Sequence, residues 1–356
     1  MIYPCGSPSI TEREIARVVQ SMQDGRLTQG KSVLEFEARL AELLNVQHVV
    51  ACASGTAALH LALASLELKP GDEVLVPDVS FVATANAVSY TGATPVLVDI
   101  DHSNWNIDLV DAERKISSRA RVILPVHLYG VPCDMDEMQL FADKHSLEIV
   151  EDAAESFGGH WRGTPSGTHG ICGTFSFYAN KIITTGEGGA VVTNNQGFAE
   201  TLRFLRGQAQ SPIRRFWHSE IGFNYRMTDI AASIGLAQLE RLSEFLEERH
   251  RVVATYRKEL HGTLQYPEQD GMAPWMFTGA FRDLTPYTRA ENRLKVEGIE
   301  SRPVFTPMHR LPMYARPDRQ FPVSCHVSDY GISLPTYPSL SDADVRTIAT
   351  CVIGAE

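Results

Sequence analysis

Cysteine is scarce in this chain of 356 residues, and no two cysteines stand in a CxxC pair. A chain of this length is not a disulfide-stapled scaffold, and scattered thiols are not typical of a metal or redox motif. The sequence therefore predicts reduced thiols in a cytoplasmic protein. The six residues are Cys5, Cys52, Cys133, Cys172, Cys325 and Cys351.

Long hydrophobic runs and an excess of positive charge are also lacking. No apolar run reaches the length of a transmembrane helix, and residues 1–6 do not combine a basic segment with an apolar one. Lys and Arg number 32 against 43 Asp and Glu, which gives a net charge of −11. We expect neither a membrane nor nucleic acid as a partner, and an anionic ligand must be held by local donors.

Several common catalytic motifs are missing. The chain has no G-x-x-x-x-G-K-[ST] or G-x-G-x-x-G loop between a strand and a helix, no H-E-x-x-H and no G-x-S-x-G. Its 12 histidines are not paired at zinc-ligand spacing. The sequence therefore predicts no metal site and disfavours P-loop, dinucleotide and serine-hydrolase chemistry.

What the chain does contain is an alternation of short apolar strands with helices, which predicts an α/β fold with a largely parallel, doubly wound sheet. Ligands of such sheets bind at the carboxyl ends of strands. With 44% hydrophobic residues the chain can form one large domain and one smaller one, placed here at 1–235 and 236–356. The expected strands are 48–52, 73–76, 95–99, 121–126, 147–152, 174–180 and 190–193, and the expected intervening helices are 57–66, 80–90, 108–116 and 135–145.

Helical patterns precede and follow this alternation. Thr11 and Glu14 form a capping-box pattern that predicts a helix as far as Gln23. A single long helix over 228–260 is expected to lead into a smaller α+β domain with strands at 275–278 and near 299–304. A further amphipathic helix over 31–44 is expected to present Val33, Leu34, Phe36, Leu40, Leu43 and Leu44 on one side.

Lys181 stands between an apolar strand and the glycine-rich turn 186–189, which leads into a second apolar strand. Most lysines are solvated surface charges. Here the buried flanks, and glycines that permit close backbone approach, favour a recessed and reactive amine. A free lysine has a pKa of about 10.4, so little of it is nucleophilic at pH 7, and burial or imine formation with an aldehyde removes that limit. The pattern suggests pyridoxal phosphate as the cofactor.

Other residues match the remaining needs of that cofactor. Asp152 ends a strand and could pair with the pyridinium nitrogen, although such an aspartate is more commonly a helix N-cap. Gly55 and Thr56 stand at a strand-to-helix junction that could bind phosphate or be an ordinary helix start, and Ser176 could add a donor. Phe81 could cover the flat ring or simply lie in the core.

With these residues in hand, the chain resembles the DegT-type nucleotide-sugar aminotransferases. The resemblance covers nearly the whole chain. It implies fold type I of the pyridoxal-phosphate-dependent transferases, the aspartate-aminotransferase-like fold. That fold has a seven-stranded, mostly parallel sheet in the large domain and a smaller α+β C-terminal domain. The stretches that carry it include 54–59 (SGTAAL), 125–130 (PVHLYG), 151–155 (EDAAE), 173–177 (GTFSF) and 186–189 (GEGG).

Carried over to this chain, the resemblance implies that Lys181 forms the imine with the cofactor and then moves protons. It implies that Asp152 holds the pyridine nitrogen and that Glu155, where many relatives have Gln, lies near the phenolic oxygen. Asn224 would reach the phosphate of a neighbouring subunit, so a homodimer with shared active sites is expected. The remaining cofactor contacts implied are Gly55, Thr56, Phe81 and Ser176.

The implied reaction moves the amino group of L-glutamate, by way of pyridoxamine phosphate, to a nucleotide-linked 4-keto-6-deoxy sugar in ping-pong fashion. Stretches such as 217–228, 302–305, 307–312 and 334–338 resemble the branch that aminates C4 of GDP-4-keto-6-deoxy-D-mannose for lipopolysaccharide O-antigen synthesis. Lys181 itself argues against a dehydrating branch that has His there. The candidate substrate contacts are Arg226, Arg302, His309 and Tyr314.

Two alternatives remain open at this stage. The same chemistry could act on a dTDP- or UDP-linked keto sugar, with amination at C3 instead of C4. A protein of another class, a regulator that binds the cofactor without turnover, would keep the pocket but show no glutamate-dependent conversion of the cofactor. The intact set of Asp152, Ser176, Lys181 and Asn224 disfavours the second alternative.

Overall fold

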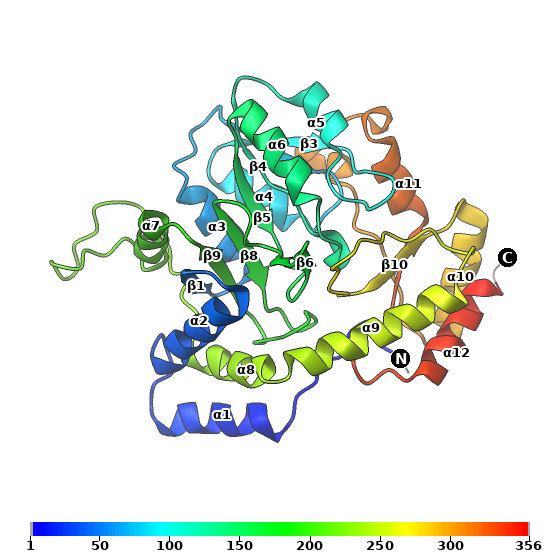
Figure 1. Ribbon diagram of the computed structural model, residues 1–356, viewed down its shortest axis with the longest axis horizontal. Coiled ribbons are helices and arrows are strands. Elements are labelled where there is room, and N and C mark those ends of the chain that lie inside the picture. The colour runs from blue at the N-terminus through cyan, green and yellow to red at the C-terminus, as the bar shows by residue number, and fades with distance from the viewer. Residues whose placement is uncertain (1–2, 355–356) are drawn as a thin grey trace.

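The computed structural model describes residues 3–354 (Figure 1). At its centre lies a seven-stranded sheet in the order β1-β9-β8-β5-β4-β2-β3. β9 runs antiparallel to both of its neighbours, and the pairs from β8 to β3 are all parallel, so the expected mostly parallel sheet is confirmed. The strands are β1 (His48–Cys52), β2 (Glu73–Pro77), β3 (Thr94–Val98), β4 (Ala120–Ile123), β5 (Glu148–Asp152), β8 (Cys172–Ser176) and β9 (Gly189–Thr193).

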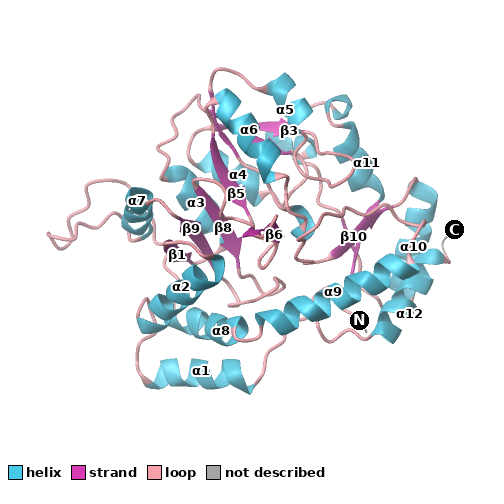
Figure 2. Ribbon diagram, in the orientation of Figure 1, coloured by secondary structure: helices cyan, strands magenta, loops and turns pink. Residues whose placement is uncertain are grey.

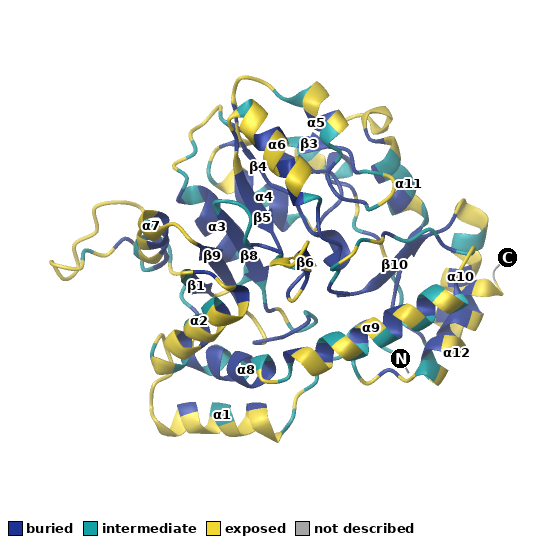
Figure 3. Cartoon of the chain, in the orientation of Figure 1, coloured by how far each residue is buried: buried dark blue, intermediate teal, exposed yellow. Residues whose placement is uncertain are grey.

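Helices enclose this sheet, and Figure 3 shows most of its strand residues as buried. All five residues of β2 and all five of β9 are buried, as expected for strands of an α/β fold that is covered on both faces. The helices of this part of the chain are α1 (Glu12–Gln23), α2 (Lys31–Leu44), α3 (Gly55–Ala64), α4 (Ala83–Tyr90), α5 (Leu109–Lys115), α6 (Met135–His145), α7 (Gln196–Arg206) and α8 (Asp229–Leu239).

Several element boundaries differ from those expected. The strand expected to reach residue 126 ends at Ile123, and the following Pro125 has no N–H to donate to a strand ladder. The strand expected over 174–180 ends at Ser176. The helix expected from residue 80 begins at Ala83, and the side chain of Ser80, before the helix, hydrogen-bonds the hydroxyl of Thr84 in its first turn.

The two N-terminal helices form as expected, but the buried face of α2 is narrower than the apolar face expected for residues 31–44. The capping box of α1 is present: Glu14 accepts from the main-chain N–H of Thr11 at 2.7 Å. In α2 the side chains of Leu34 and Leu43 are 64% and 46% exposed. They lie about 100° round the helix from buried neighbours, so they leave the core-facing stripe. The residues of α2 that are buried are Val33, Phe36, Leu40 and Leu44.

The single helix expected over 228–260 is two helices. α8 ends at Leu239 and α9 (Leu242–Glu259) begins after a break at Arg241, whose backbone is not helical. The guanidinium of Arg241 binds the side chain of Ser9 at 2.9 Å and lies 3.6 Å from Glu14. This anchoring to the N-terminal segment accounts for the turn. The domain boundary at 235–236 falls inside α8 and stays a prediction.

The C-terminal part of the chain forms a three-stranded antiparallel sheet in the order β10-β12-β11, with helices against it (Figure 2). The strand expected at 275–278 begins later, at Phe277, because the carbonyl of Trp275 is already bonded by the Arg249 side chain. The strand expected near 299–304 is only two residues long. The bounds are β10 (Phe277–Ala280), β11 (Arg302–Pro303), β12 (Gly331–Leu334), α10 (Leu284–Val296), α11 (Pro322–Tyr330) and α12 (Asp342–Ile353).

Within residues 3–354, no helix is long and apolar enough to cross a membrane.

Short elements complete the fold of these residues. A two-stranded hairpin lies beside the main sheet, and four single-turn 3₁₀ helices connect longer elements. These are β6 (His160–Trp161), β7 (Thr164–Pro165), η1 (Leu128–Gly130), η2 (Met308–Arg310), η3 (Pro312–Tyr314) and η4 (Asp318–Gln320).

Candidate active site

A cavity of about 490 Å³ opens at the carboxyl ends of the parallel strands, where ligands of α/β sheets are expected. β5 ends in it at Asp152 and β8 ends in it at Ser176, while the C-terminal part of the chain supplies one wall. The lining residues are Ser54, Gly55, Thr56, Leu59, Ser80, Phe81, Ala83, Thr84, Val126, Asp152, Ala154, Glu155, Ser176, Tyr178, Asn180, Lys181, Glu187, Trp275, Arg302 and Phe305.

Lys181 is recessed in this cavity, with its side chain only 12% exposed. It stands in the loop between β8 and β9, and its main-chain N–H donates to the carbonyl of Tyr178 at 2.9 Å. Its Nζ lies 3.7 Å from the ring centre of Trp275. Burial lowers the pKa of the amine, and the nearby carboxylates of Glu155 and Asp152 oppose that shift. The net direction favours the neutral, nucleophilic form.

Glu155 holds a carboxylate oxygen 3.5 Å from Nζ of Lys181. The other oxygen accepts from the main-chain N–H of Tyr129 at 2.8 Å, which fixes the orientation of the carboxyl group. Glu155 is 5% exposed, and burial raises its pKa while the Lys181 charge acts to lower it. The pair can share a proton, because each group makes the charged form of the other less unfavourable.

Asp152 is buried at the end of β5 and accepts two hydrogen bonds. The Thr84 hydroxyl donates to Oδ2 at 2.9 Å and the main-chain N–H of Ala154 donates to Oδ1 at 3.2 Å. Burial raises the pKa of this carboxyl, and the Thr84 bond works against that shift. The segment after Asp152 forms turns rather than a helix, so this aspartate is not a helix N-cap.

The start of α3 lies unusually close to the end of β8. Ser54 caps this ten-residue helix by accepting from the N–H of Ala57 at 3.1 Å. A Cβ added at Gly55 would lie 2.8 Å from Cβ of Ser176, which is closer than real Cβ atoms approach other atoms. Glycine is therefore required for this approach. The result is a cradle of helix N-terminus and hydroxyl groups that suits a phosphate.

An aromatic row crosses the cavity. Phe81, which is 56% exposed, meets Phe305 edge to face at 6.0 Å. Phe305 stacks on Tyr129 with ring centres 5.6 Å apart and planes 4° apart. Tyr129 in turn stacks with Trp275 at 6.1 Å and 12°. The row supplies apolar faces on which a flat ring or a sugar could lie.

The cavity brings together eight of the residues proposed from sequence, and four others lie outside its lining. Asn224 is exposed in the segment before α8, and Arg226 pairs through its backbone with β1. The Tyr314 hydroxyl donates to the side chain of Asn86 at 2.8 Å. His309 is buried, with both ring nitrogens facing carboxylates. The eight are Gly55, Thr56, Phe81, Asp152, Glu155, Ser176, Lys181 and Arg302.

Thr84 and Trp275 were missed by the sequence reasoning. Thr84 could have been found from its position four residues after Ser80, because that spacing aims both side chains in one direction at the start of a helix. No local signal marked Trp275, which lies 94 residues beyond Lys181 in the sequence and meets it only in the folded chain.

Known proteins that share this fold are aminotransferases, which gives the class of the protein. Among solved structures, the "Putative sugar aminotransferase Spr1654" of Streptococcus pneumoniae in its PMP form superposes with a TM-score of 0.94 at 29% identity, covering 99% of this chain and 98% of that one. DesV of S. venezuelae, in complex with a ketimine intermediate, gives 0.91 at 33% identity, with coverage of 97% and 95%.

Residues 8–353 match the model of the DegT/DnrJ/EryC1/StrS aminotransferase family, and the chain belongs to this family. Two similar curated proteins are named GDP-perosamine synthase. The one from Caulobacter vibrioides is 46% identical over 332 residues, which is 90% of this chain and 89% of that protein. The one from Escherichia coli O157:H7 is 39% identical, with coverage of 98% and 97%.

Proposed function

We propose that this protein is a pyridoxal-phosphate-dependent GDP-perosamine synthase. It would transfer the amino group of L-glutamate to C4 of GDP-4-keto-6-deoxy-D-mannose. The observation that carries the proposal is Lys181, a recessed amine in a cavity that also contains Asp152. The names of the similar proteins from C. vibrioides, E. coli and Vibrio cholerae, at 36 to 46% identity, support the choice of substrate.

The residues around the cavity fit pyridoxal phosphate. The cavity of about 490 Å³ is large enough for a ligand of this size, and the cradle at Gly55 would be filled by any side chain there. Lys181 would attach the cofactor, Asp152 would face its ring nitrogen, and Phe81 would cover its ring. When bound, this cofactor supplies an electron sink that stabilises a carbanion next to nitrogen.

The chain's own groups would move the protons. Lys181 lines the cavity as a candidate base, and burial lowers the pKa of its amine, which favours the neutral form. Glu155, held by the Tyr129 N–H, can accept a proton from Nζ or return one. The Trp275 ring lies 3.7 Å from the amine and would shield one side of it from solvent.

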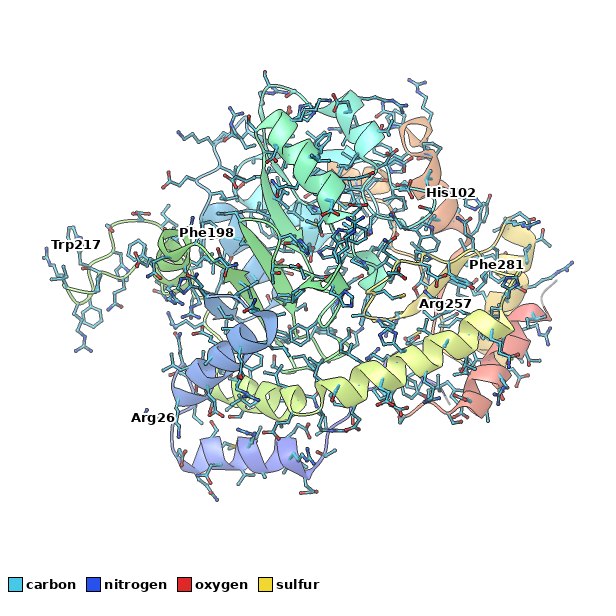
Figure 4. The ribbon with its side chains drawn as sticks, viewed as in Figure 1. Arg26, His102, Phe198, Trp217, Arg257 and Phe281 are labelled. Carbon is cyan, nitrogen blue, oxygen red and sulfur yellow. The ribbon has the colours of Figure 1, made fainter. Side chains whose placement is uncertain are left out.

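We also propose a homodimer with shared active sites. The segment between α7 and α8 forms an arm that extends beyond the body of the molecule (Figure 4), and Asn224 pairs through its backbone with Gly207, the residue after α7. Four large apolar side chains on this arm are exposed, a pattern typical of surfaces covered by a partner. The four are Ile213, Phe216, Trp217 and Ile221, with exposures of 96%, 75%, 50% and 87%.

The experiment that tests the function follows the visible absorbance of the purified protein before and after L-glutamate. A yellow band that bleaches with glutamate, followed by formation of an amino sugar from GDP-4-keto-6-deoxy-D-mannose, would support the proposal. Turnover of only a dTDP- or UDP-linked ketone would redirect the substrate assignment. A yellow protein that glutamate leaves unchanged would point to another amino donor or to a cofactor-binding regulator. A protein that pyridoxal phosphate cannot turn yellow would contradict the proposal.

A further inference from the structure

Outside the cavity, three potential metal ligands meet at one point of the C-terminal part of the chain. Nε2 of His309 lies 3.0 Å from Oδ1 of Asp318 and 3.7 Å from Sγ of Cys325. One ligand atom from each residue lies within 4.8 Å of the other two. The three come from η2, η4 and α11, so only the fold brings them together, and no local sequence motif announced them.

His309 is held in the orientation of a metal-binding histidine. Its Nδ1 lies 2.6 Å from Oδ2 of Asp78, its main-chain N–H donates to Oδ1 of the same carboxylate at 2.8 Å, and both residues are buried. The imidazole stacks on Phe321 with ring centres 4.4 Å apart. A carboxylate behind the second ring nitrogen is the usual support of a ligating histidine, because it fixes the tautomer and leaves Nε2 free to bind.

Asp318 is oriented by a different contact. Its Oδ2 accepts from Arg310 at 2.9 Å, while Oδ1 is the oxygen nearest His309. The same guanidinium also binds Asp329 at 3.1 Å, so its charge is divided between two carboxylates. The side chain of Asp318 is 61% exposed, which leaves an approach open to an ion and a water molecule.

Oxygen and sulfur both approach Nε2 of His309. Oδ1 of Asp318 lies 3.0 Å from this nitrogen, and Sγ of Cys325 lies 3.7 Å from it. Nitrogen, carboxylate oxygen and sulfur are the three kinds of donor atom that zinc binds in proteins. A tetrahedral zinc with bonds of about 2.0 and 2.3 Å places N and S roughly 3.5 Å apart, close to the 3.7 Å found here.

We propose that His309, Asp318 and Cys325 bind a divalent transition-metal ion, zinc foremost, with water as the fourth ligand. Binding would release the thiol proton of Cys325, and the Nε2 proton where present, to solvent, because only the thiolate and the free imidazole nitrogen ligate. None of the three residues lines the cavity, so the ion would be structural. It would tie η4 and α11 to Asp78, which lies two residues before Ser80 in the cavity wall.

The test uses the full-length, cofactor-loaded protein after dialysis against a chelator, titrated with Co²⁺ as a spectroscopic substitute for zinc. We expect one equivalent to bind with a thiolate-to-cobalt charge-transfer band in the near ultraviolet. Cys325→Ser should abolish that band, and Asp318→Asn should weaken binding by roughly 10- to 100-fold. Competition by zinc should remove the band from the unsubstituted protein.

Two control variants separate the site from its surroundings. Asp329→Asn removes the other carboxylate bound to Arg310, and Cys351→Ser removes a thiol on α12, so neither should change the band. Absence of the band, or a band that survives Cys325→Ser, would overturn the proposal and leave the three side chains as a polar cluster without an ion. The readout does not depend on aminotransferase activity, so either proposal can fail alone.

Discussion

Thr84 donates its hydroxyl proton to Oδ2 of Asp152 at 2.9 Å, and both side chains are buried beside the cavity. Oγ of Ser80 lies 3.0 Å from Oγ1 of Thr84. Two successive hydrogen bonds therefore connect Ser80, through the first turn of α4, to the end of β5. This contact orients the carboxylate that would meet a cofactor's ring nitrogen, and it comes from a residue that had not been proposed from the sequence.

Thr84→Val keeps the shape of the side chain but removes this donor. We expect the pKa of Asp152 to rise further, because burial already raises it and the Thr84 bond is the largest opposing effect. The loss should cost about 1–3 kcal/mol of unfolding free energy, measured by urea denaturation, and pyridoxal phosphate should bind more weakly in a spectrophotometric titration. Thr84→Ser should restore both values. Equal weakening in Thr84→Ser would show that the methyl group, not the hydroxyl, matters.

Lys181→Ala should still bind pyridoxal phosphate but should not turn over. The variant lacks both the attaching amine and the base, so the rate of amine transfer should fall roughly 10⁴-fold or more. The measurement is the absorbance change on adding L-glutamate, followed in stopped flow. Lys144→Ala, which removes an exposed lysine on α6, is the matched control. Normal turnover in Lys181→Ala would contradict the assignment.

Glu155→Gln should shift the pH dependence of cofactor attachment to the apoprotein. Burial lowers the pKa of Lys181 and Glu155 raises it, so loss of the carboxylate should lower that pKa further. More neutral amine would then be present at acidic pH, and the acidic limb of the rate profile should move to lower pH. The rate is read from the rise in visible absorbance. Glu187→Gln, at an exposed cavity residue, should leave the limb in place.

Gly55→Ala should force α3 away from β8. The new Cβ would lie 2.8 Å from Cβ and 3.0 Å from Oγ of Ser176, so we expect a loss of about 1–3 kcal/mol in unfolding free energy. Pyridoxal phosphate affinity, measured by titration, should fall with it. The double variant Gly55→Ala/Ser176→Gly should recover stability but not affinity. Gly197→Ala, where a Cβ meets nothing closer than 3.6 Å, is the control.

Mixing two inactive variants tests the shared site. In a homodimer whose sites combine Lys181 of one subunit with Asn224 of the other, Lys181→Ala and Asn224→Ala subunits form heterodimers with one intact site. At equal amounts, after subunit exchange, about a quarter of the wild-type activity should return. Mixing Lys181→Ala with itself after the same treatment gives the baseline. No recovery, in mixtures shown to contain heterodimers, would place Asn224 outside a neighbour's site.

The sequence was most informative about candidate functional residues that stand at or after the end of a strand. Lys181 and Asp152 follow apolar strands, and the parallel sheet brings such strand ends to one edge, so their proximity could be anticipated. The mostly parallel sheet followed from the alternation of strands and helices in the same way. These inferences needed only local patterns and one general rule about α/β sheets.

The features that escaped prediction depend on contacts between distant segments. The break between α8 and α9 follows from Arg241 binding Ser9, and nothing near residue 241 signals that partner. His309 was proposed as a substrate contact because an anionic nucleotide needs nearby cations, and nothing in the sequence indicated that its two ring nitrogens face Asp78 and Asp318. Local pattern cannot reveal which distant group satisfies a polar side chain, because that choice is made by the tertiary fold.

The stacking of Tyr129 with both Phe305 and Trp275 joins two parts of the chain beside the cavity. Tyr129 belongs to the segment after β4, and its two partners belong to the C-terminal part of the chain. Each stacked pair contributes about 0.5–1.5 kcal/mol beyond its buried area. Movement of the C-terminal part away from the segment after β4 would break both pairs at once. Widening of the cavity mouth in that direction would therefore cost about 1–3 kcal/mol in lost stacking.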